Sequence, residues 1–299
     1  MPRWIEETFH PHWRVRLQAD KVLHEVKTQH QHLVIFTNAT WGTVLMLDGV
    51  CQLTTSDEFI YHEMMAHVPL MALPAPRRVL VVGGGDGGVL REVLKHPSVD
   101  KATLCEIDRA VIDLSLKHYP EIAGGSLDDR RADVVIADGL KYVADTREKF
   151  DAIIVDSSEP IGPSAVLHTR EFFTDCKRAL KAGGILITQN GLPFLFPEHL
   201  KGTSEIFTSL FKATSPYLCT QPCYFGGPFA LNWASDDAAL LKIPVASLQR
   251  RMAKRGISTR YYTPAVHLGA FALPGYVADA VAAPAAKRKA RSAQGRRKA

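Results

Sequence analysis

Residues 79–88 constrain the fold of this chain more than any other segment. They read Val-Leu-Val-Val-Gly-Gly-Gly-Asp-Gly-Gly, so a short β-branched run enters a turn with five glycines around one acid. Gly83, Gly85 and Gly88 have the G-x-G-x-x-G spacing of a strand–turn–helix nucleotide site, where glycine lets the backbone approach a ligand closely. The spacing alone is also compatible with a tight strand–helix turn that binds nothing.

Asp86, inside this turn, indicates the charge of the ligand. A helix that begins after a glycine-rich turn normally favours an anion such as a pyrophosphate at its N-terminus. A carboxylate at Asp86 would instead repel a pyrophosphate and attract an ammonium group. The turn therefore favours a nucleoside with a cationic tail and argues against a nicotinamide-dependent dehydrogenase.

From residue 78 onward, apolar runs alternate with helical stretches. The runs are nearly continuous, as in a parallel sheet covered on both faces. We expect strands at 79–82, 102–106, 133–136, 151–155 and 184–189, and helices near 88–96, 109–118, 139–147 and 170–181. After Pro193 the pattern weakens to one helix near 198–211 and strands near 216–219 and 229–234. Residues 57–285 are thus predicted to form an α/β domain with a doubly wound sheet.

Residues 1–56 are predicted to form a small antiparallel β domain. Strand formers occupy 31–36, 43–47 and 50–54, with turn residues between them. Thr55, followed three residues later by Glu58, fits a capping box that starts a helix. Pro69 and Pro74 are expected to end that helix.

The net charge of +5 arises from the C-terminus. Residues 287–299 hold seven of the 36 bases and no acid, which leaves 29 bases against 31 acids, or −2, for the rest. We expect 286–299 to be a basic disordered tail that binds anions only non-specifically. The charge therefore does not predict a specific nucleic-acid partner.

Composition also bounds the cellular location. No apolar run of about 18 residues is present, so no membrane span is expected. The first residues carry acids where a signal peptide would carry bases, and we therefore expect a cytoplasmic protein. The five scattered cysteines form no C-x-x-C pair and are expected to be free thiols.

Acids stand at or just beyond the ends of four predicted strands: Asp86, Glu106, Asp138 and Asp156. Such strand ends converge on the ligand site of a doubly wound sheet. Each acid alone could simply cap the next helix. Together they repel one another unless cations bind. A divalent metal would suit them, but no recognisable metal-ligand spacing accompanies them, so we expect no metal.

Residues 156–168 are predicted to form a lid.

Four segments resemble one family. Residues 47–52, 57–64, 83–93 and 156–163 are similar to those of the bacterial polyamine aminopropyltransferases, the spermidine synthase family, in the same order and with the same spacing. The resemblance covers about residues 5–280. It implies a small N-terminal β domain, residues 1–56, followed by a Rossmann-like, methyltransferase-like catalytic domain, residues 57–285. It implies transfer of an aminopropyl group from decarboxylated S-adenosylmethionine to putrescine, which gives spermidine and 5′-methylthioadenosine. It also implies a homodimer and no cofactor, because the nucleoside is a co-substrate.

The resemblance assigns site residues as well. By similarity, the donor is held by Gln31, Asp86, Glu106, Asp138, Gly139 and Pro163, with Glu106 on the ribose hydroxyls and Asp138 on the adenine amino group. The diamine is expected at His62, Asp156, Glu159, Gln189 and Tyr224. Asp156 would accept the amine proton while Tyr61 and His62 orient the amine.

Two positions depart from the family pattern. Glu159 stands where the family usually has aspartate, and residues 221–224 read Gln-Pro-Cys-Tyr where Ile-Pro-Thr-Tyr is common. Acceptor preference therefore stays open, including other di- and polyamines. An S-adenosylmethionine-dependent methyltransferase and a non-catalytic polyamine- or nucleoside-binding protein are further alternatives, against which Asp86 and the set of Tyr61, His62 and Asp156 argue.

Overall fold

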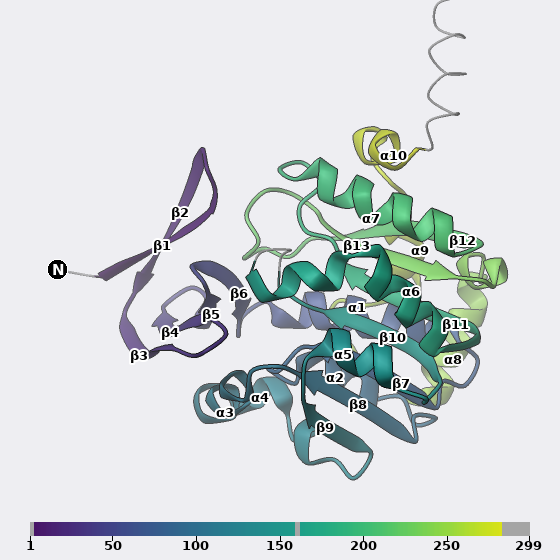
Figure 1. Ribbon diagram of the computed structural model, residues 1–299, viewed down its shortest axis with the longest axis horizontal. Helices are drawn as coiled ribbons and strands as arrows, with labels where there is room; N and C mark the ends of the chain where they lie inside the picture. Colours follow the sequence, from purple (N-terminus) through teal and green to yellow (C-terminus); the bar gives the residue numbers. More distant parts are fainter. Residues whose placement is uncertain (1–2, 159–161, 283–299) are drawn as a thin grey trace, which may run out of the picture.

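The protein consists of small β-sheets at one end and a large α/β unit at the other (Figure 1). The computed structural model describes residues 3–158 and 162–282. The predicted acceptor residue Glu159 and the predicted basic tail 286–299 lie outside the described residues.

The N-terminal part is antiparallel, as predicted. Its first two strands form a hairpin that extends away from the body, and the next four form a sheet in chain order (Figure 1). These strands are β1 (Arg3–His10), β2 (Trp13–Ala19), β3 (Lys21–Lys27), β4 (His32–Asn38), β5 (Gly42–Leu47) and β6 (Val50–Thr54). Alternation along β4 explains the position of this sheet, because Leu33 and Ile35 pack towards the helix Arg109–His118, whereas Val34 and Phe36 pack towards Cys223.

Helix α1 (Glu58–Ala72) follows this sheet, but the predicted capping box is wrong. Asp57 is the N-cap and makes no side-chain cap hydrogen bond. Its two oxygens are already used, because Oδ1 accepts from the Thr54 hydroxyl at 2.6 Å and Oδ2 accepts from the Cys223 backbone N–H at 2.7 Å. Tertiary bonds have therefore displaced the local cap.

Pro69 does not end α1, contrary to the prediction. The helix continues through it to Ala72, and all of its residues except Phe59 are buried. A proline removes one backbone hydrogen bond, and burial of nearly the whole helix against the sheet outweighs that loss.

The central sheet has the predicted doubly wound core. Its order is β12-β13-β11-β10-β7-β8-β9. The five strands from β11 to β9 are parallel, and β13 pairs antiparallel with both β11 and β12. The strands are β7 (Arg78–Gly83), β8 (Lys101–Glu106), β9 (Ala132–Ile136), β10 (Phe150–Asp156), β11 (Leu180–Gln189), β12 (Ala213–Cys219) and β13 (Phe229–Ser235). Chain order reverses between β7 and β10, so ligands are expected at the carboxyl ends of these two strands.

Helices cover both faces of the sheet (Figure 1). Val79 and Val81 pack with α1 on one face, and Leu80 and Val82 pack with Phe172 on the other. The helices are α2 (Gly88–Leu94), α3 (Arg109–His118), α4 (Pro120–Ala123), α5 (Gly139–Asp145), α6 (Arg170–Ala179), α7 (Pro197–Leu210), α8 (Val245–Arg255), α9 (Pro264–Ala270) and α10 (Gly275–Val281). This double coverage explains why the strands are continuous apolar runs.

All five cysteines are buried free thiols, as expected. Among residues 3–158 and 162–282, no helix has the length and apolar character needed to cross a membrane.

Candidate active site

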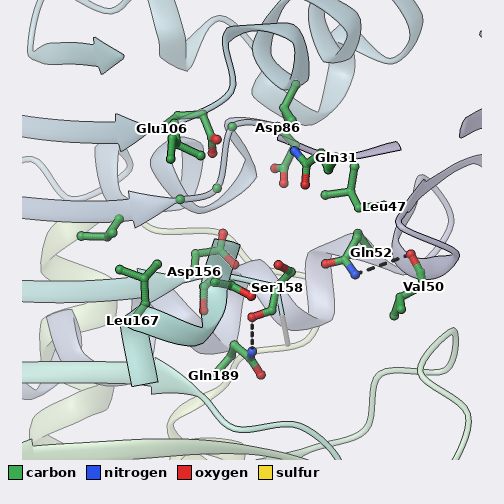
Figure 2. Close-up of a pocket in the computed structure, with 18 of the residues that line it drawn as sticks. Gln31, Leu47, Val50, Gln52, Asp86, Glu106, Asp156, Ser158, Leu167 and Gln189 are labelled. Atoms are coloured by element: carbon green, nitrogen blue, oxygen red, sulfur yellow. Dashed lines mark hydrogen bonds between the residues drawn. The ribbon is translucent and has the colours of Figure 1, made fainter. Parts of the chain in front are cut away.

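A cavity of about 370 Å³ lies where the carboxyl ends of the central strands meet the N-terminal sheet. Figure 2 shows Asp86, Glu106 and Asp156 around it, together with Gln31 and Gln52 from the N-terminal part. The predicted site residues that line it are Gln31, Tyr61, His62, Asp86, Glu106, Asp138, Gly139, Asp156, Gln189 and Tyr224. Pro163 lies in the 3₁₀-helix Gly162–His168, of which Ser164, Val166 and Leu167 line the cavity.

The glycine turn is shaped by the protein around it. A Cβ at Gly83, where φ is +83°, would overlap the backbone carbonyl of Asp156 on the neighbouring strand. A Cβ at Gly88 would overlap the imidazole ring of His62. Glycine at these two positions therefore lets the turn pack against α1 and β10, which brings His62 and Asp156 to the cavity.

Asp86 is fixed at the start of α2. Its Oδ1 accepts a hydrogen bond from the Gly88 backbone N–H at 2.7 Å and lies 3.5 Å from Nε2 of His62. The side chain is 15% exposed and borders the cavity. A carboxylate in this position is available to a cationic group that enters the cavity.

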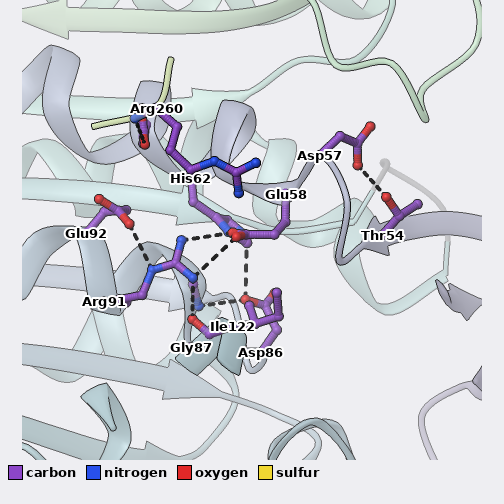
Figure 3. Close-up of polar contacts among 12 residues, drawn as sticks. Thr54, Asp57, Glu58, His62, Asp86, Gly87, Arg91, Glu92, Ile122 and Arg260 are labelled. Atoms are coloured by element: carbon purple, nitrogen blue, oxygen red, sulfur yellow. Dashed lines mark hydrogen bonds and ion pairs between the residues drawn. The ribbon is translucent and has the colours of Figure 1, made fainter. Parts of the chain in front are cut away.

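His62 is buried between two acids (Figure 3). Its Nδ1 lies 2.5 Å from Oε2 of Glu58, one helical turn earlier, and its Nε2 faces Asp86. Burial alone would lower the pKa of His62, but the Asp86 and Glu58 carboxylates raise it to about 9. The sequence indicated substrate as the partner of His62, whereas in the structure both ring nitrogens already face carboxylates.

Asp156, at the end of β10, is bound to Tyr61. The Tyr61 hydroxyl donates to Oδ1 at 2.7 Å, while Oδ2 is buried and has no hydrogen-bond partner within the described part of the chain. Burial and the nearby Asp86 carboxylate raise the pKa of Asp156 to about 7. This side chain can therefore hold or release a proton near neutral pH, and one oxygen remains to accept it.

Glu106 and Gln31 belong to one chain of contacts. Oε1 of Glu106 accepts from the Asp108 backbone N–H at 2.8 Å, and burial raises the pKa of Glu106 to about 7. The Asp108 carboxylate in turn accepts from Nε2 of Gln31 at 3.2 Å. Sequence reasoning did not single out Asp108, which ties the N-terminal sheet to the end of β8.

Asp138 and Gly139 lie at the start of α5. Asp138 is its N-cap and accepts from the Leu140 backbone N–H at 2.9 Å, which is the capping role considered for each strand-end acid. A Cβ at Gly139 would lie 2.5 Å from Cγ1 of Val82. Both residues line the cavity, so capping and ligand contact are compatible for Asp138.

Two further predicted residues fix the opposite wall. The Tyr224 hydroxyl donates to the backbone carbonyl of Gln52 at 2.6 Å. Nε2 of Gln189 donates to the Ser158 carbonyl, and its Oε1 accepts from the Gly191 backbone N–H, both at 3.0 Å. Gln189 therefore anchors the start of the predicted lid, and Gln52 is a lining residue that sequence reasoning had not assigned.

Family profiles of known proteins match two parts of this chain. A profile described as the spermine/spermidine synthase domain matches residues 58–242, and one described as the spermidine synthase tetramerisation domain matches residues 3–55. The chain belongs to the spermine/spermidine synthase family. The family resemblance and the enzyme class predicted from the sequence are thereby confirmed.

Members of the spermine/spermidine synthase family match along almost the whole chain. Polyamine aminopropyltransferase 1 of Pseudomonas aeruginosa is 49% identical over 92% of this chain and 96% of its own length. A polyamine aminopropyltransferase of a Ruegeria species is 47% identical over the same shares. A crystal structure of a spermidine synthase in complex with the transition-state analogue AdoDATO superposes with a TM-score of 0.89 at 36% identity, over 94% of this chain and 96% of that chain. The predicted Rossmann-like fold is confirmed.

Metal ligands are not gathered at this site. Within residues 3–158 and 162–282, no group of three or more His, Cys, Asp or Glu side chains is arranged to hold a metal ion.

Proposed function

We propose that this protein is a spermidine synthase. It transfers the aminopropyl group of decarboxylated S-adenosylmethionine to putrescine and releases spermidine and 5′-methylthioadenosine. The observation that carries this proposal is the cavity itself, in which Asp86 and Asp156 face space that a polycation can fill. The donor is a co-substrate, and the proposal requires no cofactor or metal.

The donor fits the β7–β8 side of the cavity. Its primary ammonium pairs with Asp86, its ribose hydroxyls with Glu106, and its adenine amino group with Asp138. Ordinary S-adenosylmethionine carries a carboxylate beside its ammonium, which Asp86 would repel. The same carboxylate therefore disfavours the methyltransferase alternative, although the fold is shared.

The acceptor fits between Asp156, Tyr61 and Tyr224. One amine of the diamine hydrogen-bonds to the free Oδ2 of Asp156. The diamine is a dication in water, so its reacting nitrogen must lose a proton before it can attack. Asp156, with a pKa raised to about 7, is a stronger base than an exposed aspartate and accepts that proton.

The transfer step is an in-line displacement. The nitrogen lone pair forms a bond to the methylene carbon next to sulfur, the carbon–sulfur bond breaks, and its electron pair stays on sulfur. The leaving group is a neutral thioether and needs no acid. Alignment of two substrates in one cavity supplies a large part of the rate.

An oligomeric, cytoplasmic enzyme is part of the proposal, and residues 3–55 support its oligomeric state. The matching profile for this region is described as a tetramerisation domain, and the hairpin β1–β2 extends away from the body (Figure 1). A homodimer is the smallest assembly consistent with the proposal. Light scattering of the purified protein should give a mass at least twice the 33.0 kDa of one chain.

Donor selection tests the proposal directly. Isothermal titration calorimetry should show that decarboxylated S-adenosylmethionine binds at least about tenfold more tightly than S-adenosylmethionine, since one close like-charge contact costs over about 1 kcal/mol. Equal or tighter binding of S-adenosylmethionine would favour the methyltransferase alternative.

A further inference from the structure

The arrangement around His62 determines the protonation state of its ring. Each ring nitrogen lies against a carboxylate, Nδ1 at 2.5 Å from Glu58 and Nε2 at 3.5 Å from Asp86. A neutral imidazole has one N–H and one lone pair, so one of the two acids would face a lone pair. Only the imidazolium, with two N–H groups, suits both acids.

Glu58 is itself held in place by Arg91 (Figure 3). The guanidinium of Arg91 donates to Oε2 of Glu58 at 2.9 Å, to the Ile122 carbonyl at 2.6 Å and to Oε1 of Glu92 at 2.8 Å. Arg91 is therefore anchored on three sides. Because Oε2 of Glu58 faces both Arg91 and His62, a continuous line of opposite charges runs from Arg91 through Glu58 and His62 to Asp86.

The ring of His62 has little room to move. Gly88, the last glycine of the motif, lies so close to the imidazole that a Cβ would overlap three ring atoms. The same glycine donates its N–H to Asp86. The ring and the Asp86 carboxylate are thus positioned by one backbone residue, and the geometry of the pair is fixed before any substrate binds.

We propose that Glu58 and Arg91 are positioning residues of the donor site, which hold His62 as a fixed imidazolium that orients Asp86 and weakens its repulsion of Asp156. The inference rests on the proposed function for the meaning of the donor site. It gives His62 the role of a permanent charge, in place of the predicted contact with the reacting amine.

The charged groups around the ring come from four elements. Glu58 and the Tyr61 ring belong to α1, Asp86 to the turn after β7, Arg91 to α2, and Asp156 to the end of β10. Asp86 raises the pKa of Asp156, and His62 lowers it. Loss of the His62 charge should therefore raise the pKa of Asp156 further, although Glu58 and Arg91 touch neither Asp156 nor the cavity.

The variant Glu58→Gln tests this proposal. It keeps the shape of the side chain and removes the charge that faces Nδ1. In the wild-type protein, ¹⁵N NMR of the His62 ring, assigned with His62→Gln, should show an imidazolium at pH 8. In Glu58→Gln the pKa of the His62 ring should be about two units lower. The acidic limb of the plot of kcat/KM against pH, where Asp156 loses its proton, should move to higher pH by about one unit. Both enzymes use the same amine, so a difference between their pH profiles must arise from a titrating group of the protein and not from the substrate.

Glu63→Gln is the matched control on the same helix. Glu63 is also buried and accepts three backbone hydrogen bonds, from Arg260, Tyr261 and Tyr262. Its replacement should reduce stability and leave the acidic limb in place. A neutral His62 ring at pH 7 in the wild type would overturn the proposal. So would an acidic limb at the same pH in the kcat/KM profiles of Glu58→Gln and Glu63→Gln.

These outcomes are separable from the proposed function. Absence of aminopropyl transfer by the wild-type protein would contradict the proposed function alone. The ring titration needs no substrate, and it would still decide whether Glu58 sets the charge of His62.

Discussion

The Tyr61 hydroxyl donates a 2.7 Å hydrogen bond to Oδ1 of Asp156, although 95 residues separate the two in the chain. Burial and the Asp156 charge raise the pKa of Tyr61 well above its usual range, so its hydroxyl stays protonated and acts as a donor. The bond fixes one oxygen of Asp156 and leaves Oδ2 without a hydrogen-bond partner among the described residues.

Tyr61→Phe should separate this bond from the packing of the ring. The hydrogen bond from Tyr61 lowers the pKa of Asp156, so its loss should shift the acidic limb of the rate profile to higher pH. We expect kcat to fall about tenfold, as for one hydrogen bond to a charged group. Steady-state kinetics from pH 6 to 9 measure both effects, and an unmoved limb would show that Tyr61 only packs.

Asp86→Asn tests the donor anchor. The variant retains the acceptor for the Gly88 N–H but removes the charge. Donor affinity should fall by about 2 kcal/mol or more, as for loss of a charged hydrogen-bond partner. Calorimetry with decarboxylated S-adenosylmethionine measures this, with Asp113→Asn, an exposed acid on α3, as the control. Unchanged affinity would refute the role of Asp86.

Asp156→Asn should stabilise the unliganded protein while it abolishes most turnover. The folded pKa of Asp156 is about 7 against an ordinary 3.8, so the folded state binds more protons than the unfolded state between these values. The free energy of unfolding therefore falls as pH rises through that window, and the full destabilisation by the buried carboxylate charge is present above pH 7. The variant lacks this destabilisation because an asparagine side chain carries no charge.

Urea unfolding at pH 5, 6, 7 and 8 measures this effect. The difference in unfolding free energy between Asp156→Asn and wild type should grow by roughly 2.5 kcal/mol from pH 5 to pH 8. A difference that is constant across pH would mean that Asp156 has an ordinary pKa.

Gln189→Met tests the anchoring of the predicted lid. The variant preserves side-chain volume and removes the bonds to the Ser158 carbonyl and the Gly191 N–H. We expect KM for the diamine to rise about tenfold, because loss of two hydrogen bonds loosens the acceptor side. Donor affinity by calorimetry should stay the same. A loss confined to donor binding would place the role of Gln189 elsewhere.

The sequence was most informative where burial decides structure. The parallel strands were predicted to within a few residues, because β-branched runs buried on both faces have few alternatives. The start of α1 was predicted wrongly because Asp57 bonds to Cys223, 166 residues away. Helices α8, α9 and α10 were not expected, and α8 shows why, since Leu248 is its only fully buried residue.

The same distinction applies to the candidate site, where some residues could be found from the sequence and others only from the fold. Asp86, Glu106, Asp138 and Asp156 could be found because the carboxyl ends of neighbouring strands converge. Glu58 was interpreted as a helix cap, and its contacts with His62 and Arg91 were missed. The i, i+4 spacing of Glu58 and His62 was the available signal, but Arg91 comes from a different helix and only the fold brings it there.

A product assay decides whether this protein transfers an aminopropyl group to putrescine. Purified protein, decarboxylated S-adenosylmethionine and a panel of diamines, with putrescine included, would be incubated together and the products identified by mass spectrometry. Spermidine and 5′-methylthioadenosine are expected in equal amounts from putrescine. A bound donor with no aminopropyl transfer to any amine would contradict this expectation and would leave a binding protein on the same fold.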